Sequence, residues 1–206
     1  VAALLAQEKK SILLLESRDA LGGLSSTHEF ASGFKCNMVY DYIRWIDPRL
    51  IKRLSLQKYG LKMISPDPLR IALDENGNHI SFYSDPVKTA ESISQHSTKD
   101  ADNWHEFTAY IKKLTLFLEP LYKMTPPIIS ELGIKDLLSM SALLKPILKH
   151  DSRGLVDTIR SIPMMMPELL DEWFESKLLR GSLAASGIAH ITQGPYSAAT
   201  VLNFLH

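Results

Sequence analysis

A carboxylate and a pair of glycines stand close together near the start of the chain. Glu16 ends the apolar run 12–15, and Gly22 and Gly23 follow a few residues later. A carboxylate at the end of a buried strand can accept hydrogen bonds from the hydroxyls of a ribose. Adjacent glycines let backbone N–H groups approach a phosphate, because no Cβ stands in the way. The pattern is typical of half a dinucleotide site, although a solvent-exposed acid before an ordinary turn gives the same sequence.

The other half of such a site is missing from the sequence. Arg18 lies between the acid and the glycines, where it could add charge for a pyrophosphate or be an ordinary surface base. A dinucleotide site of this kind also needs a strand and a G-x-G-x-x-G turn about 20 residues before the acid. Glu16 lies too near Val1 for that turn to fit. We therefore expect either an ordinary acid or an internal piece of a longer protein.

The composition is that of an ordinary globular protein. Of 206 residues, 45% are hydrophobic and 22% are charged, with 23 bases balancing 23 acids. The zero net charge gives no indication of nucleic acid, and we expect none as a partner. A single cysteine, Cys36, excludes an internal disulfide and favours a reducing intracellular compartment, the cytoplasm or the mitochondrial matrix. The histidines lack zinc-ligand spacing, so no metal site is expected.

The elements that must position these residues change character along the chain. A helix over 1–9 and a buried strand over 11–16 form the second half of a βαβ unit. Short strands or extended loops are expected at 27–30 and 33–36, and strands at 61–65, 70–74 and 79–83. Residues 75–78 contain the Asn-Gly pair of a hairpin turn. Helices are expected at 47–60, 84–96, 99–122, 134–149, 152–162, 167–186 and 195–206, with a break at the prolines in 125–127.

Several segments together resemble a known family. They occur in the order "LLLESRDALGG", "THEFASGFK", "YGLKMISPDP", "LLDEWFESKLLRGSLA" and "GPYSAATVLNFLH". In this order they are similar to the phytoene desaturase-related FAD-dependent oxidoreductases, over essentially the whole chain. The acid followed by two glycines is shared by many FAD proteins, so it indicates the cofactor. The later segments indicate the branch.

The resemblance implies an α/β fold (mixed α+β), in which a partial FAD-binding Rossmann domain is joined to a substrate domain of sheet plus helices. Residues 1–60 would be part of the FAD/NAD(P)-binding domain, 61–190 the substrate domain, and 191–206 the start of a return to the FAD domain. In relatives the G-x-G-x-x-G would end just before Val1, and another glycine-rich segment would follow His206. We therefore expect a fragment truncated at both termini, with an incomplete sheet, an open cofactor groove and no activity alone.

The resemblance also implies the cofactor, FAD, and its contacts. Glu16 would bind the ribose. The remaining contacts would be Arg18, Gly22 and Gly23 along the pyrophosphate and Ser25 and Ser26 towards the flavin. The implied activity is hydride transfer between the flavin and an apolar small-molecule substrate, in the desaturase or saturase direction. No catalytic residue is indicated.

Several alternatives stay open at this point. A carotenoid isomerase-like flavoprotein would carry out no net redox change, and an interaction module would keep only a vestigial flavin site. The methionines 164–166 are typical of core packing, yet residues 164–190 could also border an apolar substrate channel. Peripheral membrane contact is left open, and the sequence predicts no oligomeric state.

Overall fold

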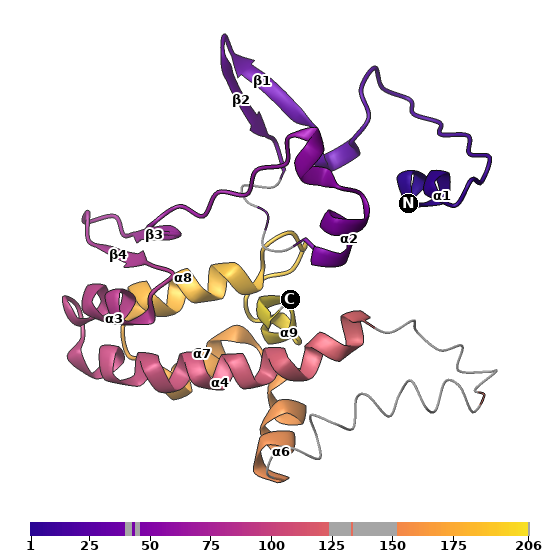
Figure 1. The fold of residues 1–206 in the computed structure, drawn as a ribbon. Coiled ribbons are helices and arrows are strands. Elements are labelled where there is room, and N and C mark those ends of the chain that lie inside the picture. The colour runs from indigo at the N-terminus through magenta and orange to yellow at the C-terminus, as the bar shows by residue number, and fades with distance from the viewer. Residues whose placement is uncertain (40–42, 44–45, 124–132, 134–151, 206) are drawn as a thin grey trace. The chain divides into compact units, whose positions relative to one another are not determined.

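The computed structural model describes residues 1–39, 43, 46–123, 133 and 152–205. The chain divides into two compact units, unit 1 over 1–64 and unit 2 over 65–206. Helices and small antiparallel sheets occur together (Figure 1), which gives a mixed α and β structure. The predicted combination of helices and strands is thus confirmed, whereas the Rossmann domain within it stays a prediction.

Unit 1 holds a short helix and a β-hairpin. Helix α1 covers Ala2–Gln7, the 3₁₀ turn η1 covers Gly23–Ser25, and strands β1 (Thr27–Ala31) and β2 (Phe34–Asn37) pair antiparallel. The expected strand segments near 27–30 and 33–36 are therefore confirmed.

The predicted strand over 11–16 is wrong. These residues are extended without strand pairing, and Leu13 and Leu15 are 81% and 82% exposed. A strand needs a neighbour to satisfy its backbone N–H and C=O groups. Within the described part of unit 1, β1 and β2 pair with each other, and no strand lies beside 11–16. The apolar run therefore stays open to solvent.

The second helix of unit 1 is shorter than predicted. Asp47 caps α2 (Pro48–Arg53) as expected, since its Oδ1 accepts the N–H of Arg49 at 2.8 Å. The helix ends before Ser55, which has a left-handed φ of 52°, and a 3₁₀ turn, η2 (Leu56–Tyr59), follows. The predicted strand at 61–65 is also absent; the segment is extended without pairing. No described residue of unit 1 is buried.

Unit 2 begins with the hairpin that the Asn-Gly pair predicts. Strands β3 (Arg70–Leu73) and β4 (His79–Phe82) pair antiparallel. Asp74 holds the turn, because its Oδ1 accepts the N–H groups of Asn76 and Asn78 at 2.9 and 2.8 Å. The prediction for this hairpin is confirmed.

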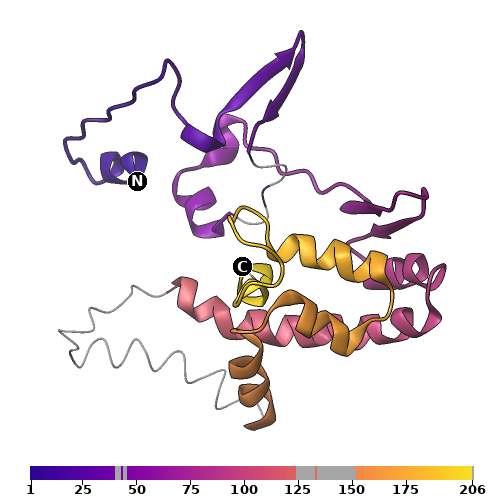
Figure 2. The same ribbon diagram turned by 180° about the vertical axis from the view of Figure 1, so that it is seen from behind.

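The rest of unit 2 is helical. Its described helices are α3 (Pro86–Ser94), α4 (Thr98–Lys123), α6 (Ser152–Ser161), α7 (Met166–Trp173), α8 (Lys177–Gly187) and α9 (Thr200–Leu205). Figures 1 and 2 show α4 as the long helix on which α3, α7 and α9 pack. None of the helices in the described ranges is long and apolar enough to cross a membrane. The helix predicted at 134–149 and the break at 125–127 lie outside the described residues.

Two helix predictions in unit 2 need correction. The helix predicted over 167–186 is two helices, because Phe174 is extended (φ −132°, ψ 147°) and buried. The carboxylate of Asp100 accepts the N–H groups of Glu175 and Ser176, at 2.9 and 2.8 Å, and so replaces acceptors that a continuous helix would supply. The helix predicted over 195–206 begins only at Thr200.

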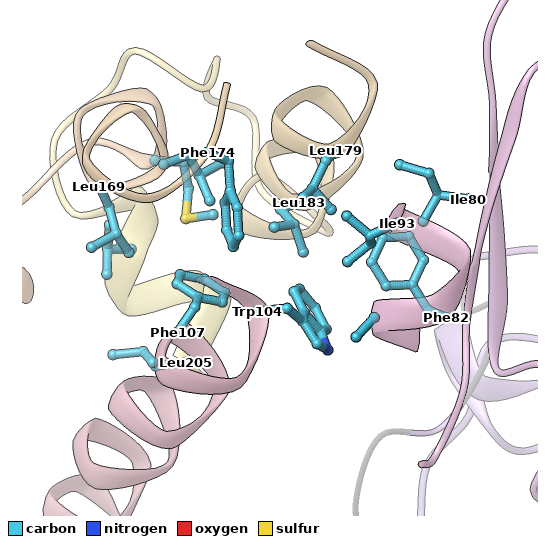
Figure 3. Packing of buried hydrophobic residues seen from close by; sticks show 14 of the residues in the cluster. Ile80, Phe82, Ile93, Trp104, Phe107, Leu169, Phe174, Leu179, Leu183 and Leu205 are labelled. Carbon is cyan, nitrogen blue, oxygen red and sulfur yellow. The ribbon is translucent and has the colours of Figure 1, made fainter. Parts of the chain in front are cut away.

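The core of unit 2 has aromatic rings at its centre and aliphatic side chains at both ends (Figure 3). The rings of Phe107 and Phe174 meet edge-on, with centroids 4.9 Å apart. Helix α9 also packs in this core. Val201 has no exposed surface, and the Thr200 hydroxyl accepts the N–H of Met166 at 2.8 Å. The core therefore joins β4 to the described helices α3, α4, α7, α8 and α9.

Candidate functional site

Glu16 lies at the end of the exposed run, with its carboxylate turned back onto the chain. Its Oε1 accepts the N–H groups of Ser17 and Arg18, at 2.8 and 3.1 Å. Its Oε2 has no hydrogen-bond partner among the described residues. Because a carboxylate offers about four lone-pair sites, Glu16 can still accept bonds from a ligand.

Gly22 and Gly23 form a turn that favours glycine. Their φ angles are 128° and 55°, a region that side chains with a Cβ seldom adopt. A Cβ placed on Gly23 would meet no atom within 4 Å, so this side of the turn is open. The backbone N–H groups of Gly22, Gly23 and Leu24 have no acceptor in the described part of the chain. The turn thus presents unsatisfied donors to an open space.

The serines after the glycines stabilise this turn from within. The N–H of Ser25 donates to the carbonyl of Gly22 at 2.9 Å, and the hydroxyl of Ser26 donates to that of Gly23 at 2.8 Å. The Oγ of Ser26 also lies 2.8 Å from Nε2 of His28.

Asn37 ties the turn to the β1–β2 hairpin. Its side-chain amide donates to the carbonyls of Leu24 and Ser26, at 3.1 and 3.2 Å. Neither His28 nor Asn37 was predicted as part of the site. No spacing in the sequence indicates Asn37, because the hairpin alone brings it back to the turn.

The structure therefore brings together four of the six predicted contacts. Gly22, Gly23, Ser25 and Ser26 make a single turn, while Arg18 is bonded to Glu16 through its backbone and its guanidinium makes no bond among the described residues. These groups fit a dinucleotide, because a carboxylate can accept hydrogen bonds from ribose hydroxyls and backbone N–H groups can donate to a pyrophosphate. That any of these residues contacts FAD stays a prediction.

The methionine run divides between core and surface. Met166 has no exposed surface and lies against Gly187, where a Cβ would come within 2.3 Å of its Cγ. Met164 and Met165 are partly exposed. Met166 thus packs as core, and the predicted channel along 164–190 stays a prediction.

Comparison with known proteins follows this geometry. Over 94% of its length the chain is 27% identical to pyridine nucleotide-disulfide oxidoreductase domain-containing protein 2 of Rattus norvegicus, and 26% identical to that of Mus musculus. The predicted resemblance is confirmed for these relatives, while the wider phytoene desaturase-related family stays a prediction.

A second relative shares part of the chain. A limonene dehydrogenase component of Castellaniella defragrans is 32% identical over 55% of the chain and is covered over 21% of its own length. The chain spans 36% of the two rodent proteins. No family model matches the sequence, and no solved structure does. The names of these relatives support a general relation to oxidoreductases.

Proposed function

We propose that this chain is part of an FAD-dependent oxidoreductase and that its residues 16–26 bind the adenosine and pyrophosphate part of FAD. The observation that carries the proposal is the similarity, over 94% of the chain, to proteins named as oxidoreductases. The open glycine turn after Glu16 supports the choice of a dinucleotide cofactor. Since the chain spans 36% of these relatives, the activity belongs to the whole protein.

In this proposal each residue has a separate role. Glu16 accepts hydrogen bonds from the ribose hydroxyls, and the N–H groups of Gly22 and Gly23 donate to pyrophosphate oxygens. Arg18 adds positive charge beside the phosphates, and the turn of Ser25 and Ser26 leads the chain towards the flavin. When bound, FAD supplies the exchange of a hydride with the substrate. The protein positions an apolar substrate and keeps water away.

Redox chemistry is favoured over isomerisation by the name of one relative. The name of this relative describes a dehydrogenase and includes a hydrocarbon, limonene. We therefore propose a desaturase-type or saturase-type reaction on an apolar small molecule. Flavin absorbance under anaerobic conditions tests this choice. A desaturase-type substrate would bleach the oxidised flavin, and a saturase-type substrate would restore the absorbance of a flavin reduced beforehand. An isomerase would leave the redox state of the flavin unchanged at the end of the reaction.

The cofactor site is tested by replacing Glu16. In the full-length protein we expect Glu16→Ala to weaken FAD binding by about 1–3 kcal/mol, the scale of lost hydrogen bonds to a charged group. Asp19→Ala is the matched control, since it removes an exposed carboxylate three residues further along. Flavin fluorescence titration measures both affinities. Equal FAD affinity in the two variants and the parent would show that Glu16 is an ordinary surface acid, and a parent without flavin would favour the interaction module.

A further inference from the structure

A hollow of about 380 Å³ lies on the surface of unit 2, and none of the residues of the proposed cofactor site lines it. It is lined by the turn between β4 and α3 and by one side of α4. Tyr83 and Ser84 come from the turn, and Trp104, Thr108 and Lys112 follow one another at helical spacing along α4. Its size is within the range of small-molecule pockets.

Trp104 gives this hollow a buried donor without an acceptor. The residue is 8% exposed, and its Nε1 is buried with no hydrogen-bond partner in the part of unit 2 that the structure describes. One side of the ring packs in the core, with centroids 5.9 Å from both Phe82 and Phe107. Figure 3 shows the nitrogen on the edge of the ring that points away from Leu183. A buried N–H group normally has a partner, so a ligand atom is a natural acceptor.

The charged groups around the hollow favour an anion. Lys112 lines it and is exposed, and the ammonium of Lys88 lies 5.8 Å from the centre of the Tyr83 ring. None of the described residues that line the hollow is acidic. Two acids lie near these cations. The carboxylate of Asp67 pairs with the ammonium of Lys88 at 3.6 Å, and that of Asp85 accepts the N–H of Val87 at 2.9 Å as the cap of α3, so Lys112 is the cation that faces the hollow.

We infer that this hollow binds a small organic anion, a carboxylate attached to an apolar body. The carboxylate accepts the Trp104 Nε1–H and pairs with Lys112. The apolar body contacts the Tyr83 ring and Ala109. No bond of the ligand is made or broken. The site is independent of the proposed function, because it uses residues of unit 2 alone.

The indole N–H signals of the ¹⁵N-labelled 206-residue chain test the inference by NMR. The probe is 3-phenylpropionate, and the matched uncharged compound is 3-phenylpropanol. We expect the acid to move the Trp104 signal, assigned with Trp104→Phe, while that of Trp173 stays in place. Lys112→Gln should weaken binding about three- to fivefold, the scale of an exposed ion pair, and Lys113→Gln should leave it unchanged because Lys113 does not line the hollow.

A second variant keeps the test independent of core stability. Ala109→Leu fills the hollow from an exposed position on α4, so it should abolish the shift while the protein stays folded. Three results would each overturn the inference. These are a Trp104 signal that the acid does not move, equal affinity for the acid and the alcohol, and equal losses in Lys112→Gln and Lys113→Gln.

Discussion

Asp100 shows how one side chain can set the boundary of a distant helix. It is fully buried in α4, and its two oxygens accept the N–H groups of Glu175 and Ser176 just before α8. From the sequence it is an acid in the first turn of a helix, where such residues are common. Its acceptor role could not be predicted, because its donors lie 75 and 76 positions away.

Replacing Asp100 should therefore be costly. We expect Asp100→Ala to lower the free energy of unfolding by about 1.5–3 kcal/mol, the range for a hydrogen bond to a charged group. Urea denaturation measures the loss. Asp102→Ala, at an exposed position two residues further along α4, should change it by no more than about 0.5 kcal/mol. Similar effects of both substitutions would contradict the assigned role.

Tyr110 predicts how stability depends on alkaline pH. Burial raises the pKa of its hydroxyl, which is hydrogen-bonded to Ser161. The pKa of Tyr110 is higher in the folded state than in the unfolded state. The contribution of this side chain to the free energy of unfolding is therefore complete below the ordinary tyrosine pKa of about 10. This contribution is lost as the pH rises through the pKa that Tyr110 has in the folded state. Urea midpoints measured against pH should fall more steeply in the parent than in Tyr110→Phe. Tyr196→Phe, at an exposed residue, should keep the parent's slope.

At the scale of elements, local signals predict the helix starts and turns that neighbouring residues stabilise. Asp47 and Asp85 cap α2 and α3 near the predicted starts of the helices at 47–60 and 84–96, because capping acts within a few residues. The Asn-Gly hairpin was correct for the same reason. Predictions are wrong where a residue far away in the sequence determines the local structure. The run at 11–16 lacks a neighbouring strand among the described residues, and Asp100 divides the helix predicted over 167–186. In the candidate site, the contacts of the glycines and serines with a cofactor stay a prediction, and no local signal predicts Asn37, because it reaches their turn through the hairpin.

Two glycines of helix α8 should respond to alanine in opposite ways. A Cβ on Gly187 would lie 2.3 Å from Cγ of Met166 and 3.0 Å from the carbonyl oxygen of Thr200. We expect Gly187→Ala to destabilise the protein by about 1–3 kcal/mol through overpacking. Gly181 has nothing within 4 Å of such a Cβ. There alanine should stabilise by about 0.5–1 kcal/mol, because glycine is a poor helix former. Thermal melting compares them, and a shift of the same sign in both would contradict this packing.

At the scale of the whole molecule, the two units differ in their cores. Every buried apolar side chain of the described residues lies in unit 2, between Ile80 and Leu205. Burial of apolar surface is the main source of stability, so unit 1 has little of its own. We expect amide hydrogen exchange to be fast across residues 1–64 and slow in α4, α7 and α8. Comparable protection in both units, measured by mass spectrometry, would show that unit 1 gains stability from contacts that burial alone does not reveal.

The position of α9 has a consequence for biosynthesis. The hydroxyl of Thr200 accepts the hydrogen bond of the Met166 N–H, and Val201 is buried in the core of unit 2. A ribosome releases the chain from the N-terminal end, so β4, α4, α7 and α8 all emerge before α9 does. Until then the surface that Val201 covers stays open, and nascent chains stalled before residue 200 should be clients of chaperones that recognise exposed apolar side chains. Completion of this core therefore waits until α9 itself has been translated.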